Sequence, residues 1–297
     1  HRQDQGISQA IGTGSHDVSS EVGGITMLQG LELLATDAQT KVVAIVSKPP
    51  APDVQKRVIE RAGAIGKPVV ICFLGGDPAA SAGNVHRASS LEETARQAVA
   101  LAGARQPGGD EQSIEALATR VCASLAPSQR NLRGLYSGGT FCSEAQTIWR
   151  AAGLRVRSNA PLAEADRLAD VEASQGHTAI DLGSDEFTVG RPHPMIDPSV
   201  RDDALRAALK NHDLSVILLD LVLGYGAHAD PAEHLTKIVA DRGQDAPVLV
   251  ASVVGTEQDP QGRSAQVRKL EQAGFVVAPS NAQACELAVA IVQNAGR

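Results

Sequence analysis

Aromatic residues are scarce in this chain. They make up 2% of its 297 residues, with one Trp, two Tyr and four Phe. A core must therefore be built from aliphatic side chains, a composition that suits buried parallel strands flanked by helices. The chain also lacks a stripe rich in Lys or Arg, and its net charge is −7. Both features argue against nucleic acid as a partner.

Paired cysteines are absent as well. The chain has four cysteines, which are Cys72, Cys122, Cys142 and Cys285. None of them belongs to a C-x-x-C pair. No zinc site or other metal site is therefore expected. Wide spacing in a chain of this size is typical of reduced, buried thiols, so the predicted location is cytoplasmic.

Long hydrophobic runs are missing too. The longest apolar stretch, residues 214–223, is interrupted by Ser215 and Asp220 and is too short to span a membrane. No signal peptide is visible, so we expect a soluble protein with no membrane partner. The chain opens with HRQDQG and not with Met. We expect it to be a piece cut from a longer protein.

Strand-like and helix-like segments alternate along the whole chain. Apolar, β-branched runs predict strands at residues 7–11, 41–47, 67–74, 132–136, 154–157, 178–182, 214–223, 247–253 and 275–278. Helical spacing of apolar residues predicts helices at residues 25–34, 53–64, 91–101 and 141–152. This alternation implies right-handed βαβ units, and hence an α/β fold with parallel sheets.

A linker signal divides the alternation into two groups. Residues 104–112 combine proline and paired glycines with polar residues. We assign residues 1–106 to a first domain, 107–130 to a linker and bridging helix, and 131–297 to a second domain.

Two glycine-rich turns are predicted to lead from a strand to a helix. Small residues let an anion approach the backbone, where free N–H groups and the helix dipole attract it. The alternative in both places is an ordinary turn with a capping side chain, for which Thr140 is a candidate. The predicted phosphate-binding residues are Gly12, Thr13, Gly14 and Ser15 in the first turn, and Ser137, Gly138, Gly139 and Thr140 in the second.

The segment GRPHPMIDP, residues 190–198, has the most unusual composition. Its three prolines impose a rigid, extended path, and rigid surface loops often carry functional residues. Arg191 can clamp a phosphate or a carboxylate, and His193 can act as an acid, a base or a phosphate acceptor. We predict Arg191, His193 and Asp197 as catalytic residues. The alternative is a structural loop closed by a salt bridge between Arg191 and Asp197.

Another glycine-rich loop, separate from the two turns above, follows the longest predicted strand. Its position at a strand's carboxyl end is where parallel sheets bind ligands. We predict a substrate loop formed by Gly224, Tyr225, Gly226 and His228. The alternative is a plain connection in which Asp230 caps a helix and Pro231 is its first residue.

Several of these strings resemble the FdrA proteins. The similar segments span nearly the whole chain: ISQAIGTG (7–14), DVSSEVGG (17–24), SKPPAP (47–52), GLYSGGTFC (134–142), GRPHPMIDP (190–198) and LGYGAH (223–228). FdrA proteins are relatives of succinyl-CoA synthetase. The resemblance implies two flavodoxin-like, three-layer domains, in which the two glycine turns grip one phosphoryl group.

The chain departs from that family in two places. FdrA proteins begin with a CoA-binding domain, and this chain is expected to start after it, so CoA is not an expected cofactor. The synthetase's phosphohistidine motif has no counterpart at residues 75–90, and His86 does not replace it. The expected ligand is free phosphate or an acyl phosphate.

Three functions follow from the resemblance. The first is a subunit for phosphate-dependent acyl or carbamoyl transfer of the oxamate carbamoyltransferase type, which converts oxalurate and phosphate into oxamate and carbamoyl phosphate. The second is a subunit of an NDP-forming acyl-CoA ligase. The third is a non-catalytic scaffold. The expected partners are a small-molecule substrate, other enzyme subunits and further copies of the chain.

Overall fold

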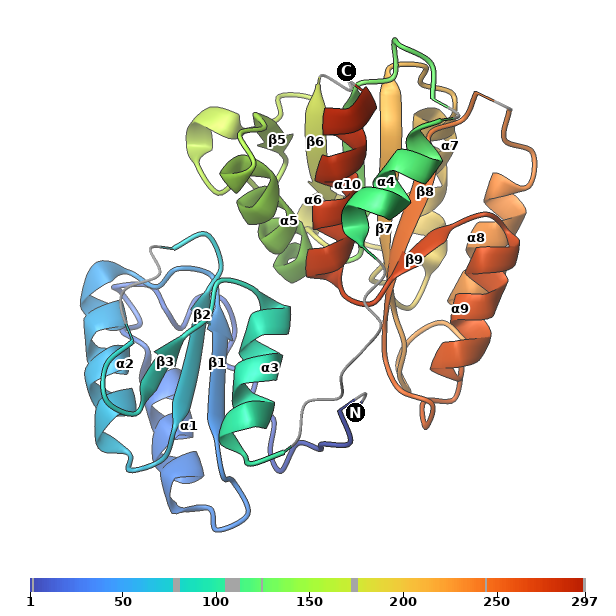
Figure 1. The fold of residues 1–297 in the computed structure, drawn as a ribbon. Coiled ribbons are helices and arrows are strands. Elements are labelled where there is room, and N and C mark those ends of the chain that lie inside the picture. Colours follow the sequence, from blue (N-terminus) through green and yellow to red (C-terminus); the bar gives the residue numbers. More distant parts are fainter. Residues whose placement is uncertain are drawn as a thin grey trace. The chain divides into compact units, whose positions relative to one another are not determined.

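The computed structural model describes His1 and residues 3–76, 81–104, 113–123, 125–171, 176–243 and 245–295. They form two compact units, His1–Asp110 and Glu111–Arg297 (Figure 1). Each unit has its own sheet, and the strands in both sheets are parallel. The prediction of an α/β fold with parallel sheets is confirmed. Of the predicted linker signal, residues 104–112, all but Ala104 lie outside the described residues.

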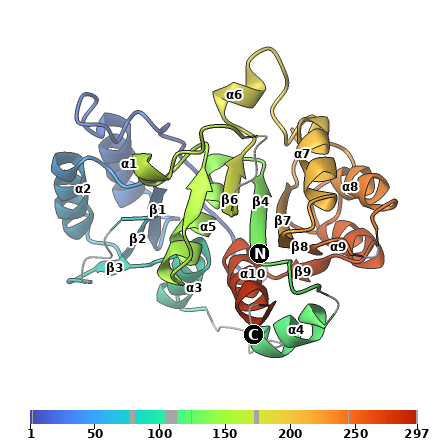
Figure 2. The same cartoon turned by 90° about the horizontal axis from the view of Figure 1, so that it is seen from above.

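The first unit is a small three-layer sandwich. Its sheet has the order β1-β2-β3, with β1 (Val43–Ser47), β2 (Val69–Phe73) and β3 (Val85–Arg87). Helices α1 (Ile25–Thr36) and α2 (Pro52–Ala64) pack on one face, and α3 (Leu91–Leu101) covers the other (Figure 2). Strand β2 is buried along its whole length, as expected for the central strand.

The strand predicted at residues 7–11 is wrong. Ile7 is 83% exposed and Ile11 is 42% exposed, so this segment has no buried face that would hold it against the sheet. Ile11 instead lies over Gly30 of α1, whose missing side chain leaves room for it. The sequence also gave no sign of β3, because three residues that include His86 and Arg87 do not form an apolar run.

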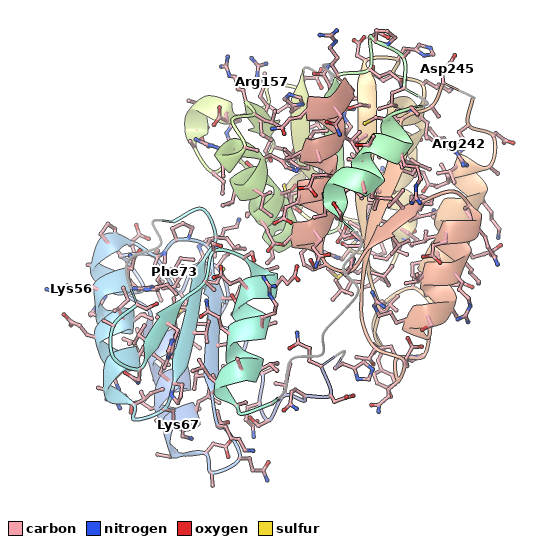
Figure 3. All side chains as sticks on the ribbon, viewed as in Figure 1. Lys56, Lys67, Phe73, Arg157, Arg242 and Asp245 are labelled. Carbon is pink, nitrogen blue, oxygen red and sulfur yellow. The ribbon has the colours of Figure 1, made fainter. Side chains whose placement is uncertain are left out.

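Helix α1 is closed at its far end by a lysine. Lys67 Nζ donates hydrogen bonds to the carbonyl oxygens of Leu34 at 2.7 Å and Asp37 at 2.6 Å. Figure 3 labels this side chain in the first unit. The last carbonyl groups of a helix have no partner within it and carry its negative end, so an ammonium group there is stabilising.

The second unit contains a six-stranded sheet with the order β5-β6-β4-β7-β8-β9. Without the short edge strand β5, this is the flavodoxin order, whose switch point lies between the first and third strands, here β4 and β7. Ligands of such sheets bind at that point, beyond the carboxyl ends of the strands. The strands are β4 (Asn131–Tyr136), β5 (Val156–Ser158), β6 (His177–Asp181), β7 (Leu214–Val222), β8 (Val248–Val254) and β9 (Val276–Ala278).

Helices cover both faces of this sheet and confirm the three-layer prediction. One face carries α4 (Ile114–Cys122), α5 (Gly139–Ala151) and α10 (Asn281–Ala295). The other carries α7 (Asp202–Leu209), α8 (Pro231–Val239) and α9 (Arg263–Gln272). Shorter pieces are α6 (Asp185–Thr188), which stands apart from the covering helices in Figure 2, and the 3-10 turns η1 (Glu164–Asp166) and η2 (Pro198–Arg201).

The helix expected to bridge the domains is part of the second unit. This helix, α4, lies beside α10 (Figure 1), and Cys122 Sγ donates to the carbonyl oxygen of Ile291 at 3.3 Å. Its amphipathic face is buried against α10, so its position is fixed within that unit.

Candidate functional site

The turn after β4 opens a helix without a side-chain cap. Strand β4 ends at Tyr136, and α5 begins three residues later with Gly138 as its N-cap residue. Gly138 makes no side-chain cap hydrogen bond to the first-turn N–H groups, which carry the positive end of the helix. The expected cap by Thr140 is wrong, because Thr140 already lies inside the first turn of the helix.

A buried aspartate fixes the path of this turn. Asp220 lies within β7, next to β4, and is completely buried. Its Oδ1 accepts hydrogen bonds from the Ser137 backbone N–H at 2.7 Å and from Ser137 Oγ at 3.2 Å. The hydroxyl of Ser137 is therefore held by the protein itself, while the glycines that follow remain open.

The charge of Asp220 is balanced by Arg201 of η2. Arg201 Nη2 lies 3.0 Å from Asp220 Oδ1 and also donates to Ser137 Oγ, and Nη1 donates to the Asp220 carbonyl oxygen at 2.8 Å. Burial lowers the pKa of Arg201, and the carboxylate of Asp220 counteracts that shift. This pair connects η2, β7 and the turn after β4 at the switch point of the sheet.

A small cavity adjoins this ion pair. It has a volume of about 20 Å³, and Ser137, Arg201 and Asp220 are among its lining residues. Arg201 Nε and Asp220 Oδ2 are buried with no hydrogen-bond partner in the described part of the chain. A space of this size and polarity suits one bridging water molecule.

His193 lies beside the open turn. A Cβ placed on Gly183 would be 2.5 Å from the Ser137 carbonyl oxygen and 2.7 Å from His193 Nε2, so only glycine fits between them. The Met195 N–H donates to His193 Nδ1 at 3.3 Å. In the neutral ring, the proton is therefore assigned to Nε2, on the side of the turn.

The other two predicted catalytic residues point elsewhere. Asp197 caps η2 by accepting from the Ser199 N–H at 3.1 Å, and its hydrogen bonding to Ser199 lowers the pKa of the carboxyl group. Arg191 is exposed and lines a different cavity. Across the described residues, Arg191 and Asp197 form no ion pair with each other. Catalytic roles for Arg191, His193 and Asp197 stay predictions.

The predicted substrate loop is anchored at its ends and open in the middle. Gln261 Nε2 donates to the carbonyl oxygens of Gly224 at 2.9 Å and His228 at 3.0 Å. The His228 N–H donates to the Met195 carbonyl oxygen at 2.7 Å, which joins this loop to the proline-rich segment. Tyr225 is 92% exposed. Asp230 caps α8, as the sequence predicted.

The first glycine turn differs from the second. Gly12, Thr13, Gly14 and Ser15 do not connect a strand to a helix, because no strand precedes them among His1 and residues 3–11, and α1 begins only at Ile25. The buried carboxylate of Asp17 accepts from the N–H groups of Thr26 at 2.8 Å and Met27 at 2.9 Å. The N-terminus of α1 is thus already supplied with a negative charge from its own chain.

Sequence reasoning missed the ion pair that shapes the open turn. Asp220 did leave a signal, since it is a charged residue inside an apolar run that must be a buried strand. Arg201 left none, because it lies in a polar stretch and is buried only through the turn η2.

The fold and this turn define a class: a parallel α/β domain with an open helix N-terminus at its switch point. Residues 135–291, more than half of the chain, match the family model described as CoA-ligase, and residues 1–75 match the one described as CoA binding domain. The chain belongs to the CoA-ligase family. The expectation that the chain lacks a CoA-binding domain is therefore wrong.

Individual relatives differ in how much they share with this chain. The uncharacterized protein YahF of Escherichia coli (strain K12) is 38% identical over 290 residues, which are 95% of this chain and 56% of that protein. The chain thus spans about half the length of the curated relative it matches.

Two solved structures are similar to this chain at a lower sequence identity. A dinucleotide forming acetyl-coenzyme A synthetase 1 from Ca. Korarchaeum cryptofilum, in complex with phosphate and ADP, is 14% identical, covers 91% of this chain and 56% of its own, and has a TM-score of 0.43. An ATP citrate lyase from Methanosaeta concilii is 14% identical, covers 93% of this chain and 37% of its own, and has a TM-score of 0.36.

None of the described helices combines the length and apolarity needed to cross a membrane. In the part of the chain that the structure describes, no group of three or more His, Cys, Asp and Glu side chains is arranged to hold a metal ion.

Proposed function

We propose that the chain is a subunit of an FdrA-type enzyme that transfers an acyl or carbamoyl group to inorganic phosphate. The observation that carries this proposal is the uncapped N-terminus of α5 at the switch point of the sheet, with His193 beside it. An open helix start binds phosphate through backbone N–H groups and the helix dipole. The ligand is phosphate or an acyl phosphate, and the site is Ser137, Gly138, Gly139 and Thr140.

The reaction we propose is of the oxamate carbamoyltransferase type. A phosphate oxygen attacks the carbamoyl carbon of oxalurate, the bond from that carbon to the adjacent nitrogen breaks, and the nitrogen takes up a proton. The products are carbamoyl phosphate and oxamate. We assign to His193 the transfer of that proton from the attacking phosphate to the leaving nitrogen, and the N–H groups of α5 stabilise the charge on the phosphoryl oxygens.

The decisive variant is Gly138→Asp. Gly138 has a φ of −166°, which any residue adopts, and a new Cβ would meet only Met195 Cε at 3.7 Å. The aspartate would cap α5 and take the place of the anion. We expect it to stabilise the unliganded protein by a few tenths of a kcal/mol and to abolish the thermal stabilisation by inorganic phosphate.

Gly138→Ala is the matched control, because it adds the same Cβ without an oxygen. Phosphate should still stabilise this variant. The proposal fails if inorganic phosphate and carbamoyl phosphate leave the melting temperature of the wild-type chain unchanged with its partner subunits present. Formation of carbamoyl phosphate from oxalurate by the full-length protein tests the substrate separately.

A second candidate is a subunit of an NDP-forming acyl-CoA ligase, and the match of residues 1–75 to a CoA binding domain favours it. Cationic groups suited to CoA phosphates stand near α1 and α2: Lys48 follows β1, and Arg57 reaches to 3.1 Å from the Cβ position of Gly23. When bound, CoA supplies the thiol that accepts an acyl group. Partner subunits are part of both proposals.

Calorimetric titration with CoA separates the two candidates. The ligase candidate predicts binding that weakens in Lys48→Ala and in Arg57→Ala. Lys56→Ala is the control, since Lys56 is an exposed α2 residue paired with Glu60 at 3.9 Å. If CoA does not bind measurably to the wild-type chain, the ligase candidate is ruled out and the phosphate-transfer proposal is the one that remains.

A further inference from the structure

A large cavity lies on one face of the second unit, over β4 and β6. Its volume is about 1010 Å³, at the upper end of the range of about 300–1,000 Å³ typical of small-molecule sites. None of the residues of the open α5 turn lines it. It is therefore a separate pocket, and an inference from it does not rest on the proposed function.

An unpaired guanidinium lies in the floor of this cavity. Arg133 of β4 is only 4% exposed, and within the described residues it donates one hydrogen bond, from Nε to Thr178 Oγ1 at 3.1 Å. Nη2 is buried without a partner, and no acidic side chain among the described residues forms an ion pair with Arg133. A buried charge without a partner is costly, so this group needs an anion that the described chain does not supply.

The surroundings of Arg133 are apolar. Leu135 lies two residues further along β4 and on the same face, opposite Ile180 of β6, and Leu182, which follows β6, also lines the cavity. Ala204 of α7 and Phe187 of α6 line the opposite side. Burial in this setting lowers the pKa of Arg133. A ligand that fills the cavity must neutralise the guanidinium of Arg133 and cover the apolar side chains around it.

The rim of the cavity limits the charge of that ligand. Three acidic residues line it, Asp170, Glu186 and Asp203, together with Arg167 and Arg191. Arg167 is already paired with Glu164, at 2.9 Å between Nη2 and Oε2. Like charges repel, so this rim disfavours a phosphate dianion or a nucleotide and admits a single negative charge.

We propose that this cavity binds a small aliphatic monocarboxylate, whose carboxylate pairs with the guanidinium of Arg133 and whose hydrocarbon chain lies against Leu135, Ile180 and Leu182. A guanidinium presents two parallel N–H donors that match a carboxylate, and Nη2 has no partner among the described residues. Thr178 orients the group from the neighbouring strand.

The test is a calorimetric and thermal-shift titration of the intact chain with sodium valerate. We expect saturable binding and a rising melting temperature in the wild type, and at least a tenfold loss of affinity in Arg133→Met. Valeramide, which has the same chain without the charge, should not bind. Arg130→Met is the matched control, because it removes an exposed arginine outside the cavity and should bind valerate like the wild type.

Two further measurements keep the test independent of folding and of the phosphate site. Ala204→Leu narrows the cavity from α7 without touching Arg133 and should also lose valerate binding. Gly138→Asp should retain it. Without ligand, Arg133→Met should melt at or above the wild-type temperature, because it removes an uncompensated buried charge.

Three results would overturn the proposal. The first is the absence of saturable valerate binding to the wild type. The second is undiminished binding to both Arg133→Met and Ala204→Leu. The third is inorganic phosphate competing with valerate at the Arg133 cavity with equal affinity, which would make the site a general anion site.

Discussion

At the residue scale, the ion pair between Arg201 and Asp220 places two opposite charges in the interior of the second unit. Both side chains are buried, and the carboxylate also holds the backbone of Ser137. Removing one member of such a pair leaves the other charge uncompensated. We expect Asp220→Asn to lower the free energy of unfolding by about 3–5 kcal/mol, measured by urea denaturation of the second unit's transition.

The double variant Arg201→Met with Asp220→Leu tests that reasoning. It removes both charges at once, so it should cost less than Asp220→Asn alone. Phosphate binding should remain weakened in the double variant, because Ser137 has lost the carboxylate that positions the turn. A double variant as unstable as the single one would contradict a charge-based explanation.

A histidine in the same unit couples stability to pH. His177 Nδ1 accepts a hydrogen bond from the Leu132 N–H at 3.3 Å, which requires an unprotonated ring nitrogen, and burial lowers the pKa of His177 from its ordinary 6.5. The unfolded chain therefore binds this proton more readily than the folded one. Stability is fully present above the unfolded pKa and falls as the pH drops below it.

We expect the wild type to lose more stability than His177→Gln when the pH is lowered from about 7.5 to about 5.5, around the ordinary histidine pKa. Urea midpoints at the two pH values measure the difference. Equal losses in both proteins would show that other groups carry the pH dependence of this unit.

At the scale of elements, the two glycine-rich turns serve their helices differently. Helix α1 takes its negative charge from Asp17 of its own chain, and α5 has no such group. We expect Asp17→Ala to destabilise the first unit by about 1–2 kcal/mol, because two helix N–H groups lose a buried acceptor. Thermal or urea unfolding of that unit measures the loss.

Asp53→Ala is the comparison for that variant. Asp53 is an exposed carboxylate on α2 that pairs with Arg57 at 3.3 Å, and exposed pairs contribute little. Its loss should change the stability by about 0.5 kcal/mol or less. An equal effect of the two variants would show that Asp17 is not a significant cap.

The elements most readily predicted from the sequence are those with the strongest patterns. The apolar run that became β7 and the helical spacing that became α2 needed no tertiary information. Residues 7–11 look like a strand, but a strand forms only where a neighbour pairs with it. The Arg133 cavity was also beyond sequence reasoning, because pairing Arg133 with Thr178 depends on the register of β4 and β6.

The same limit applies to the candidate site. Glycines mark the turn after β4 in the sequence, and the parallel topology places it at the edge of the sheet. The direction in which Arg191, His193 and Asp197 point is set by backbone hydrogen bonds within residues 190–198, such as Ile196 N–H to the His193 carbonyl oxygen at 2.8 Å. Spacing alone does not reveal those directions.

At the scale of the whole molecule, the two units have separate cores. The apolar cluster beneath α1 and α2 consists of residues of the first unit, and both clusters around the six-stranded sheet belong to the second. We expect residues 113–297, expressed alone, to unfold cooperatively at the same midpoint as the corresponding transition of the full chain. Calorimetry of both proteins provides the comparison, and a lower midpoint for the shorter one would show that the units stabilise each other.

The edges of the two sheets have a consequence for how copies of the chain can meet. Three of the four edge strands, β3, β5 and β9, are only three residues long. Short edges present few unpaired backbone groups to another molecule, which is a known protection against strand-by-strand growth into aggregates. Any self-association of this chain is therefore expected to run through side-chain surfaces and to leave the edges at β3, β5 and β9 closed to outside strands.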